Sequence, residues 1–393
     1  MWRMPVMEPM LGGNEMKYVM DCITTNWISS QGSYVKNFEA RFAEYHKMPR
    51  ALATCNGTAA LHLALTALGI GRGDEVIVPD LTFAASANAV IHCGAKPVAV
   101  DVTRAYWNMD PAMLERAITP RTKAIMPVHL YGHPCEMDAI MAIARKRKLR
   151  VVEDCAEALG AEYKGKKVGT FGDAGCFSFF SNKVITTGEG GMVVCRDEDL
   201  SEKMTVFRDH GMRREKRYWH EVAGFNYRMT NVQAAIGLAQ LEQIERFLEA
   251  RRRIAARYAA GLKGLAGITL PPEMSWAKNI YWLYSIVVDE TKAGVTRDEL
   301  IRELAREGIE TRPFFYPLHH QPPYRSSGSF PVTEGLAAKG MSLPSSNGIR
   351  PDEITRVCEN IRGRIEHHRI VSHLRLADKT ATTKRSSAAR VRP

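Results

Sequence analysis

The stretch from Phe177 to Val194, FSFFSNKVITTGEGGMVV, places a single lysine, Lys183, between a run of aromatic and small residues and a glycine turn. Such surroundings predict a half-buried side chain, and burial disfavours the ammonium form and lowers the pKa of a lysine. A lysine with a lowered pKa can act as a nucleophile and form a Schiff base. A lysine at a strand end can also extend its ammonium group into water, and this segment alone favours neither interpretation.

A second feature is the acidic pair Glu153-Asp154, which ends the apolar run RVVED. A carboxylate buried at the end of a strand needs a cationic partner, and a protonated pyridine nitrogen would meet that need. Asp154 and Glu157 also have the spacing of a capping box at a helix start. Taken alone, the cap is the commoner explanation of this pattern.

Two further segments offer groups for a phosphate and a planar ring. Asn56-Gly57-Thr58-Ala59 directly precedes a predicted helix, and free backbone N–H groups at a helix N-terminus bind phosphate, although small residues also simply cap helices. Phe83, in VPDLTFAASANAV, could stack on a planar ring, although core packing is the more frequent reason for a phenylalanine. The hydroxyl of Ser178 could reach the same phosphate.

Together, a carboxylate, a phosphate site, an aromatic face and a lysine are the groups that pyridoxal phosphate requires. The carboxylate would keep the pyridine nitrogen protonated, so that the ring accepts electrons, and the lysine would hold the aldehyde and move protons. The eight cysteines form no C-x-x-C pair and no Cys/His cluster at zinc spacing, so we expect no metal.

The elements that must position these groups are predicted from hydrophobic patterning. Short runs in which successive residues are all apolar, as in strands buried on both faces, alternate with helical stretches. This pattern predicts an α/β domain around a mostly parallel sheet. Ligands of such sheets bind beyond the carboxyl ends of the strands. The predicted strands lie in DEVIVPDLTF, KPVAVDV, KAIMPVHLYG, RVVEDCAEALG, GCFSFF and GGMVVCR.

After a long helical stretch at 231–262 the sequence pattern changes to a strand-like run followed by amphipathic helices. This change predicts a second, smaller domain. IYWLYSIVVD reads as a strand, and TRDELIRELAREG reads as an amphipathic helix. We therefore expect a large α/β domain with the N-terminal segment at 1–245, a small C-terminal α/β domain at 246–372 and a disordered basic tail at 373–393. A length of 393 residues, with 45% hydrophobic and 25% charged residues, fits this division.

The net charge of +11 is unevenly placed, because residues 375–393 carry six basic residues and one acidic residue and so hold +5 of it. A basic Ser/Thr/Ala-rich segment without periodicity is typical of disorder. No helix-turn-helix or patterned basic stripe accompanies it, so we expect no nucleic-acid partner. The sequence also shows no membrane-spanning segment and no export signal at its start, which predicts a cytoplasmic protein.

From about residue 5 to residue 370 the chain resembles the DegT/DnrJ/EryC1/StrS family of sugar-nucleotide aminotransferases, which are pyridoxal-phosphate enzymes of the aspartate-aminotransferase fold (fold type I). A subset of this family has histidine in place of the lysine and performs dehydration, so Lys183 implies transamination. The motifs that carry the resemblance are NWISSQGSYVKNFE, CNGTAALHLAL, GDEVIVPDLTFAASANAV, AIMPVHLYGHP, VVEDCAEALGA, FSFFSNKVITTGEGG and GFNYRMTNVQAAIGLAQL.

The resemblance also implies roles for individual residues. Lys183 would bind the cofactor aldehyde, Asp154 would pair with the pyridine nitrogen and Phe83 would stack on the ring. Asn226 would reach the phosphate from a neighbouring subunit, which implies a homodimer with composite sites. The residues expected at the phosphate are Gly57, Thr58, Ala59 and Ser178, and Trp27 and Ser29 lie in the segment that resembles the family's contact with the substrate sugar. Apart from the resemblance, Arg228 and His319 or His320 are candidates for contact with the substrate or the donor carboxylate, because a fixed cation suits both.

Glu157 departs from the commoner family pattern, in which this position is Gln or His. A carboxylate beside the phenolic oxygen of the cofactor would be repulsive unless it is protonated or turned away. The segments EDCAEALGA, RDHGM, GFNYRMTN and RPFFYPLHHQPPY resemble the branch that aminates a GDP-linked 4-keto-6-deoxymannose with L-glutamate. A UDP- or dTDP-linked 4-keto or 3-keto sugar stays open as the substrate, as does a regulatory or DNA-binding protein built on this fold.

Overall fold

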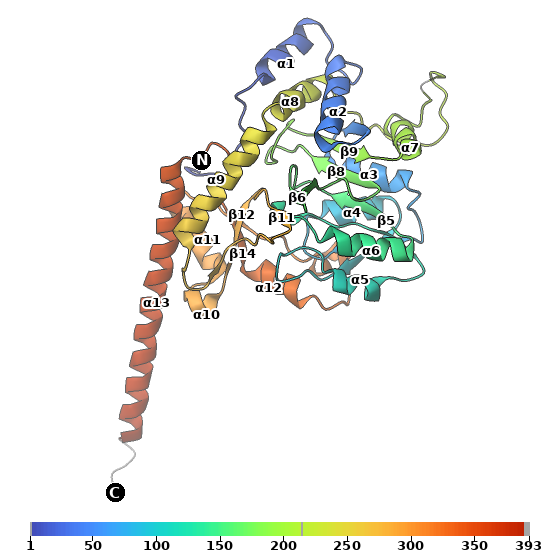
Figure 1. Ribbon diagram of the computed structural model, residues 1–393. Coiled ribbons are helices and arrows are strands. Elements are labelled where there is room, and N and C mark those ends of the chain that lie inside the picture. Colours follow the sequence, from blue (N-terminus) through green and yellow to red (C-terminus); the bar gives the residue numbers. More distant parts are fainter. Residues whose placement is uncertain (1, 214, 389–393) are drawn as a thin grey trace.

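A computed structural model describes residues 2–213 and 215–388 of the chain, with side chains described as far as residue 371 (Figure 1). A large domain surrounds a seven-stranded sheet, and a small domain surrounds a four-stranded sheet. The strands of the large sheet are β1 (Arg50–Thr54), β2 (Glu75–Pro79), β3 (Lys96–Val100), β4 (Thr122–Ile125), β5 (Arg150–Asp154), β8 (Ala174–Ser178) and β9 (Gly191–Cys195).

The large sheet has the order β1-β9-β8-β5-β4-β2-β3. The five strands from β8 to β3 are parallel, whereas β9 runs antiparallel to both of its neighbours. The expected α/β fold with a mostly parallel sheet is therefore confirmed. β1 was not among the predicted strands.

Helices cover both faces of the large sheet because its strands are apolar on both sides. In β2, Val76 and Val78 belong to one hydrophobic core and Ile77 to the opposite one, as alternation along a strand requires. The helices that cover the first of these faces are α3 (Gly57–Ala67), α4 (Ala85–His92) and α7 (Glu198–Arg208), and those that cover the second are α5 (Pro111–Ala117) and α6 (Met137–Arg147).

The helical stretch that was predicted at 231–262 consists of two helices, α8 (Asn231–Leu241) and α9 (Ile244–Leu262). α1 (Glu15–Thr24) and α2 (Ser33–His46) pack against α8. α9 leads into the small domain, whose antiparallel sheet has the order β10-β12-β14-β13. These strands are β10 (Ile268–Thr269), β12 (Tyr284–Val288), β13 (Arg312–Pro313) and β14 (Gly340–Leu343).

The remaining elements of the described chain are a small third sheet, four helices of the small domain and three single 3-10 turns. A three-stranded sheet, in the order β11-β6-β7, joins the two domains. Its strands are β6 (Glu162–Tyr163), β7 (Lys166–Lys167) and β11 (Ala277–Lys278). The other helices are α10 (Glu290–Ala293), α11 (Arg297–Arg306), α12 (Pro331–Lys339), α13 (Pro351–Ala388) and the single 3-10 turns η1 (Leu130–Gly132), η2 (Leu318–His320) and η3 (Pro322–Tyr324).

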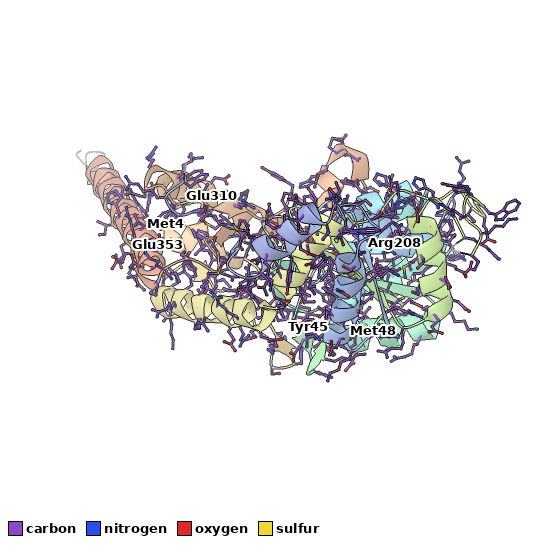
Figure 2. All side chains as sticks on the ribbon, turned by 90° about the horizontal axis from the view of Figure 1, so that it is seen from above. Met4, Tyr45, Met48, Arg208, Glu310 and Glu353 are labelled. Atoms are coloured by element: carbon purple, nitrogen blue, oxygen red, sulfur yellow. The ribbon has the colours of Figure 1, made fainter. Side chains whose placement is uncertain are left out.

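The N-terminal residues pack on the small domain, which the sequence-based division at 245 does not anticipate. Met4 is buried in the small-domain core and pairs with Ile309. The N–H of Glu310 donates to the carbonyl of Met4 at 2.9 Å. Figure 2 shows Met4 beside Glu310 and well apart from Met48 and Arg208. The chain therefore starts at the small domain and crosses to the large one.

The C-terminal segment differs from the expected disordered tail in its backbone. α13 continues through residues 373–388 and projects away from the body of the protein (Figure 1). Neither glycine nor proline occurs between Gly363 and Pro393, so no helix-breaking residue ends α13 earlier. Residues 389–393 lie outside the described part of the chain. Within the described residues, no helix combines the length and the apolar character needed to cross a membrane.

Candidate active site

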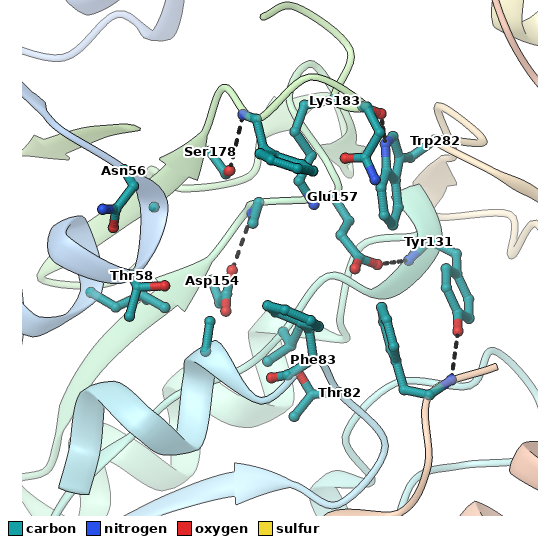
Figure 3. Close-up of a pocket in the computed structure, with 18 of the residues that line it drawn as sticks. Asn56, Thr58, Thr82, Phe83, Tyr131, Asp154, Glu157, Ser178, Lys183 and Trp282 are labelled. Carbon is teal, nitrogen blue, oxygen red and sulfur yellow. Dashed lines mark hydrogen bonds between the residues drawn. The ribbon is translucent and has the colours of Figure 1, made fainter. Parts of the chain in front are cut away.

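A cavity of about 690 Å³ opens beyond the carboxyl ends of β2, β5 and β8 (Figure 3). Parallel strands of an open α/β sheet place their ligand sites at this edge. Eight of the nine residues that were predicted for the cofactor gather here from four separate segments, and Asn226 is the exception. The cavity is lined by Gly57, Thr58, Ala59, Phe83, Asp154, Glu157, Ser178 and Lys183.

Lys183 follows β8 in a turn, and its N–H donates to the carbonyl of Phe180 at 2.9 Å. The side chain is half-buried and lines the cavity instead of extending into water (Figure 3). Burial lowers the pKa of its ammonium group, the carboxylates of Glu157 and Asp154 act in the opposite direction, and Arg312 lowers it further. The net lowering favours the free amine, which is the nucleophilic form.

Trp282, just before β12, is a site residue that sequence reasoning missed. The Nζ atom of Lys183 lies 4.0 Å from the centre of the Trp282 ring. The indole Nε1 donates to the carbonyl of Asn182 at 2.7 Å, which fixes the ring against the lysine. The only available signal was a tryptophan in a strand-like run, and nothing local connects that run with residue 183.

Asp154 ends β5 and is buried at the floor of the cavity. Its Oδ2 accepts from the hydroxyl of Ser86 at 2.8 Å, and its Oδ1 accepts from the N–H of Ala156 at 3.1 Å. No helix begins here in the described chain, so the capping-box alternative is wrong. Burial raises the pKa of Asp154 despite these donors, and a cationic group bound beside it would lower that pKa again.

Glu157 is buried, with 4% of its surface exposed. Its Oε2 accepts from the N–H of Tyr131 at 2.8 Å. Burial raises the pKa of Glu157 to about 7, although Lys183 and the Tyr131 N–H both lower it. Tyr131 has a left-handed backbone, with φ of 51°, a conformation that costs energy and that clusters at functional sites. The carboxyl group thus accepts from a residue whose backbone is strained.

The N-terminus of α3 lies at the cavity and has backbone N–H groups that an anion could use. The Oδ1 of Asn56 accepts from the N–H of Ala59 at 2.8 Å, so the N–H of Ala59 is already engaged. No acceptor among the described residues faces the N–H groups of Gly57 and Thr58, which leaves both for a phosphate. A Cβ atom on Gly57 would lie only 2.8 Å from the Cβ of Ser178, so the close approach of these two segments requires glycine.

Phe83 leaves 58% of its surface exposed, and its ring centre lies 5.7 Å from that of Phe315. Core packing therefore does not explain this phenylalanine, whose ring borders the cavity (Figure 3). Asn182 adds a buried Oδ1 atom that has no hydrogen-bond partner among the described residues. A lysine with a lowered pKa, a buried carboxylate, an exposed ring and free N–H groups together fit pyridoxal phosphate.

Six predicted residues do not line this cavity. Arg228 borders a separate cavity of about 1180 Å³ and pairs with Asp209 at 2.9 Å. His319 is buried against Asp80. The single chain therefore does not bring these residues to Lys183. They are Trp27, Ser29, Asn226, Arg228, His319 and His320.

The fold and the cavity residues define a pyridoxal-phosphate-dependent enzyme of fold type I. Residues 9–362 match the DegT/DnrJ/EryC1/StrS aminotransferase family, and the chain belongs to this family. GDP-perosamine synthase from Caulobacter vibrioides is 50% identical over 358 residues, which cover 90% of this chain and 96% of that protein. GDP-perosamine synthase from Escherichia coli O157:H7 is 48% identical over 358 residues, which cover 91% of this chain and 97% of that protein.

A solved structure shows the same fold. The PLP form of Spr1654 from Streptococcus pneumoniae superimposes with a TM-score of 0.87 at 29% identity, and the match covers 93% of this chain and 99% of that one. The family and this likeness agree with the cofactor that the cavity residues fit. Pyridoxal phosphate is therefore the cofactor of the enzyme.

Proposed function

We propose that the enzyme transfers the amino group of L-glutamate to the 4-keto group of GDP-4-keto-6-deoxymannose, which yields GDP-perosamine. The observation that carries the choice of sugar is the similarity, over nearly the full length, to two GDP-perosamine synthases. The product would be used in the cytoplasm for the biosynthesis of an O-antigen in lipopolysaccharide, or of another polysaccharide or glycoside.

When bound, pyridoxal phosphate supplies an electron sink that stabilises negative charge on the carbon that loses a proton. Asp154 would hold the pyridine nitrogen protonated, because the buried carboxylate and the positively charged pyridinium stabilise each other. Lys183 would take the proton from Cα of glutamate in the first half of the reaction. It would deliver a proton to C4 of the sugar in the second half.

A homodimer would complete the site. Asn226 is exposed, and its Oδ1 accepts only from Arg228 at 3.2 Å within the described chain. On α1 and the turn that follows it, Met16, Ile23 and Trp27 expose apolar surface, which favours burial against a second copy. In such a dimer Asn226 would reach the partner's phosphate site, and Trp27, Ser29 and Arg228 would contact the sugar nucleotide.

The choice of sugar is tested by competition. The purified enzyme, converted with L-glutamate to its amino form, would be mixed with equal amounts of the GDP-, UDP- and dTDP-linked 4-keto sugars. Mass spectrometry would then identify which sugar nucleotide gains the amino group. We expect the GDP-linked product to dominate. A dominant UDP- or dTDP-linked product would overturn the choice of sugar and leave the transamination intact.

A further inference from the structure

Three side chains outside the active-site cavity converge at one point. They are His319 and His320 in η2 and Glu334 in α12, and one ligand atom from each lies within 4.8 Å of the other two. His319 Nε2 is 3.2 Å from Glu334 Oε1. Two ligands of a tetrahedral zinc ion, each about 2.0–2.2 Å from the metal, lie roughly 3.3–3.6 Å apart. The observed spacing is close to that requirement.

His319 is held as a metal ligand would be. Its Nδ1 lies 2.6 Å from Asp80 Oδ2, and its backbone N–H donates to Asp80 Oδ1 at 2.9 Å. An ionised carboxylate only accepts hydrogen bonds, so Nδ1 carries the hydrogen and the lone pair of a neutral ring is on Nε2. A carboxylate behind a histidine is the usual arrangement around a bound metal. The His319 ring is also buried, with 7% exposed, and packs 4.6 Å from the Phe330 ring.

The other two side chains, His320 and Glu334, are accessible from solvent. His320 is exposed, and the Glu334 side chain is 47% exposed, so a hydrated cation can enter and keep water as a fourth ligand. Asp101 accepts from the N–H groups of Val332 and Thr333 at the start of α12. Its charge adds to those of Asp80 and Glu334, and three carboxylates in one region favour a cation there.

A second cluster, His129, Glu153 and Cys155, is less suited to a metal. It is fully buried. The two oxygens of Glu153 already accept from the backbone N–H groups of Gly169, Phe171 and Gly172, and Oε2 also lies 3.1 Å from His129 Nε2. The hydrogen bonds of Glu153 account for the burial of its carboxylate without an ion.

We propose that His319, His320 and Glu334 bind a zinc ion, with Asp80 orienting His319 and water completing the tetrahedron. Two histidines and a glutamate form a donor set that zinc uses in enzymes. Spacing along the chain does not reveal this site, because η3 and a loop separate the histidines from α12. All three ligands come from one chain, and none of them lines the active-site cavity.

The ion would hold one wall of the active-site cavity. It would join η2 to α12, and η2 follows the segment in which Pro313 and Phe315 line the cavity. The N–H of Leu318 donates to the carbonyl of Asp80 at 3.0 Å, and Phe315 packs against Phe83. A metal at this point would therefore reduce the motion of the segment that packs against Phe83.

The test uses the full-length, cofactor-loaded protein, stripped of metal with a chelator and titrated with Zn²⁺ against a chromophoric competitor. We expect about one tight site per chain. Asp80→Asn should weaken zinc binding by about 10–100-fold, as loss of an outer carboxylate does. His320→Ala removes a ligand and should weaken it at least as much. Zinc should also raise the melting temperature of the wild type more than that of His320→Ala.

The matched control is His367→Ala in the other adjacent histidine pair, where His368 Nε2 lies 2.9 Å from Glu303 Oε1. This control should bind zinc as the wild type does. Failure of the wild type to bind zinc, or equal affinity in the wild type and His320→Ala, would overturn the proposal and leave an ion pair among Asp80, His319 and Glu334. Because the His320 ring is exposed, its removal does not depend on refolding of the core, so this variant decides the question if Asp80→Asn fails to fold.

Discussion

Replacing Glu157 with glutamine should remove a pH-dependent loss of stability from the cofactor-free protein. Burial raises the pKa of Glu157 from its ordinary value of 4.5 to about 7. The difference of about 2.5 corresponds to roughly 3 kcal/mol, at about 1.36 kcal/mol for each pKa unit. Glutamine carries no charge at any pH, and its side-chain oxygen can still accept from the N–H of Tyr131.

The sign of the effect follows from proton binding. The folded chain binds the Glu157 proton more tightly than the unfolded chain, so this group lowers the free energy of unfolding as the pH rises from about 4.5 to 7. The variant has no such dependence. Relative to the wild type, Glu157→Gln should therefore gain up to about 3 kcal/mol between pH 4.5 and pH 8. The gain is an upper value, because Glu157 also raises the pKa of Lys183, and that support disappears in the variant.

Urea denaturation of both proteins without cofactor, at pH 5 and pH 8, measures this gain. Glu359→Gln, on the exposed side of α13, is the matched control and should show no pH-dependent gain. An equal difference between Glu157→Gln and the wild type at both pH values would refute the reasoning. The variant should also retain cofactor, since the oxygen that faces Tyr131 is kept, and loss of bound cofactor would show that the carboxylate itself is needed.

Three further changes test the site and the tail. Lys183→Ala should reduce turnover by at least about 10²–10⁴-fold with an unchanged circular dichroism spectrum, and retained turnover would remove this lysine from the mechanism. Gly57→Ala places a Cβ atom 2.8 Å from the Cβ of Ser178 and should weaken cofactor binding roughly tenfold or more in a titration, whereas unaltered affinity would contradict the phosphate cradle. Deleting residues 375–393 should leave kcat/KM within about twofold, and a larger loss would assign the tail a role in the reaction.

The sequence was informative wherever the chemistry is local. Asp154 and Ser178 each end a parallel strand, and Gly57 starts a helix, so the rule that ligands bind at strand ends already places them together. The capping-box alternative failed because a turn, instead of a helix, follows β5. β1 was missed because its apolar residues run directly into small polar ones.

Residues that depend on how the two domains pack could not be predicted in the same way. Trp282 and Arg312 reach the cavity from the small domain, and no pattern within their own segments indicates what they contact. The left-handed backbone of Tyr131 is likewise set by its surroundings, since tyrosine has no preference for that conformation. Asn226 and Trp27 were predicted by family resemblance and Arg228 by its charge, and a single chain leaves all three outside the cavity of Lys183.

The most direct test of the central claim is an absorbance spectrum of the pure enzyme through both halves of the reaction. L-Glutamate alone should convert the spectrum of the bound cofactor to that of its amino form. Subsequent addition of GDP-4-keto-6-deoxymannose should restore the starting spectrum, and Lys183→Ala should show neither change at a comparable rate. A wild-type spectrum that L-glutamate does not alter would contradict the assignment of an L-glutamate-dependent aminotransferase.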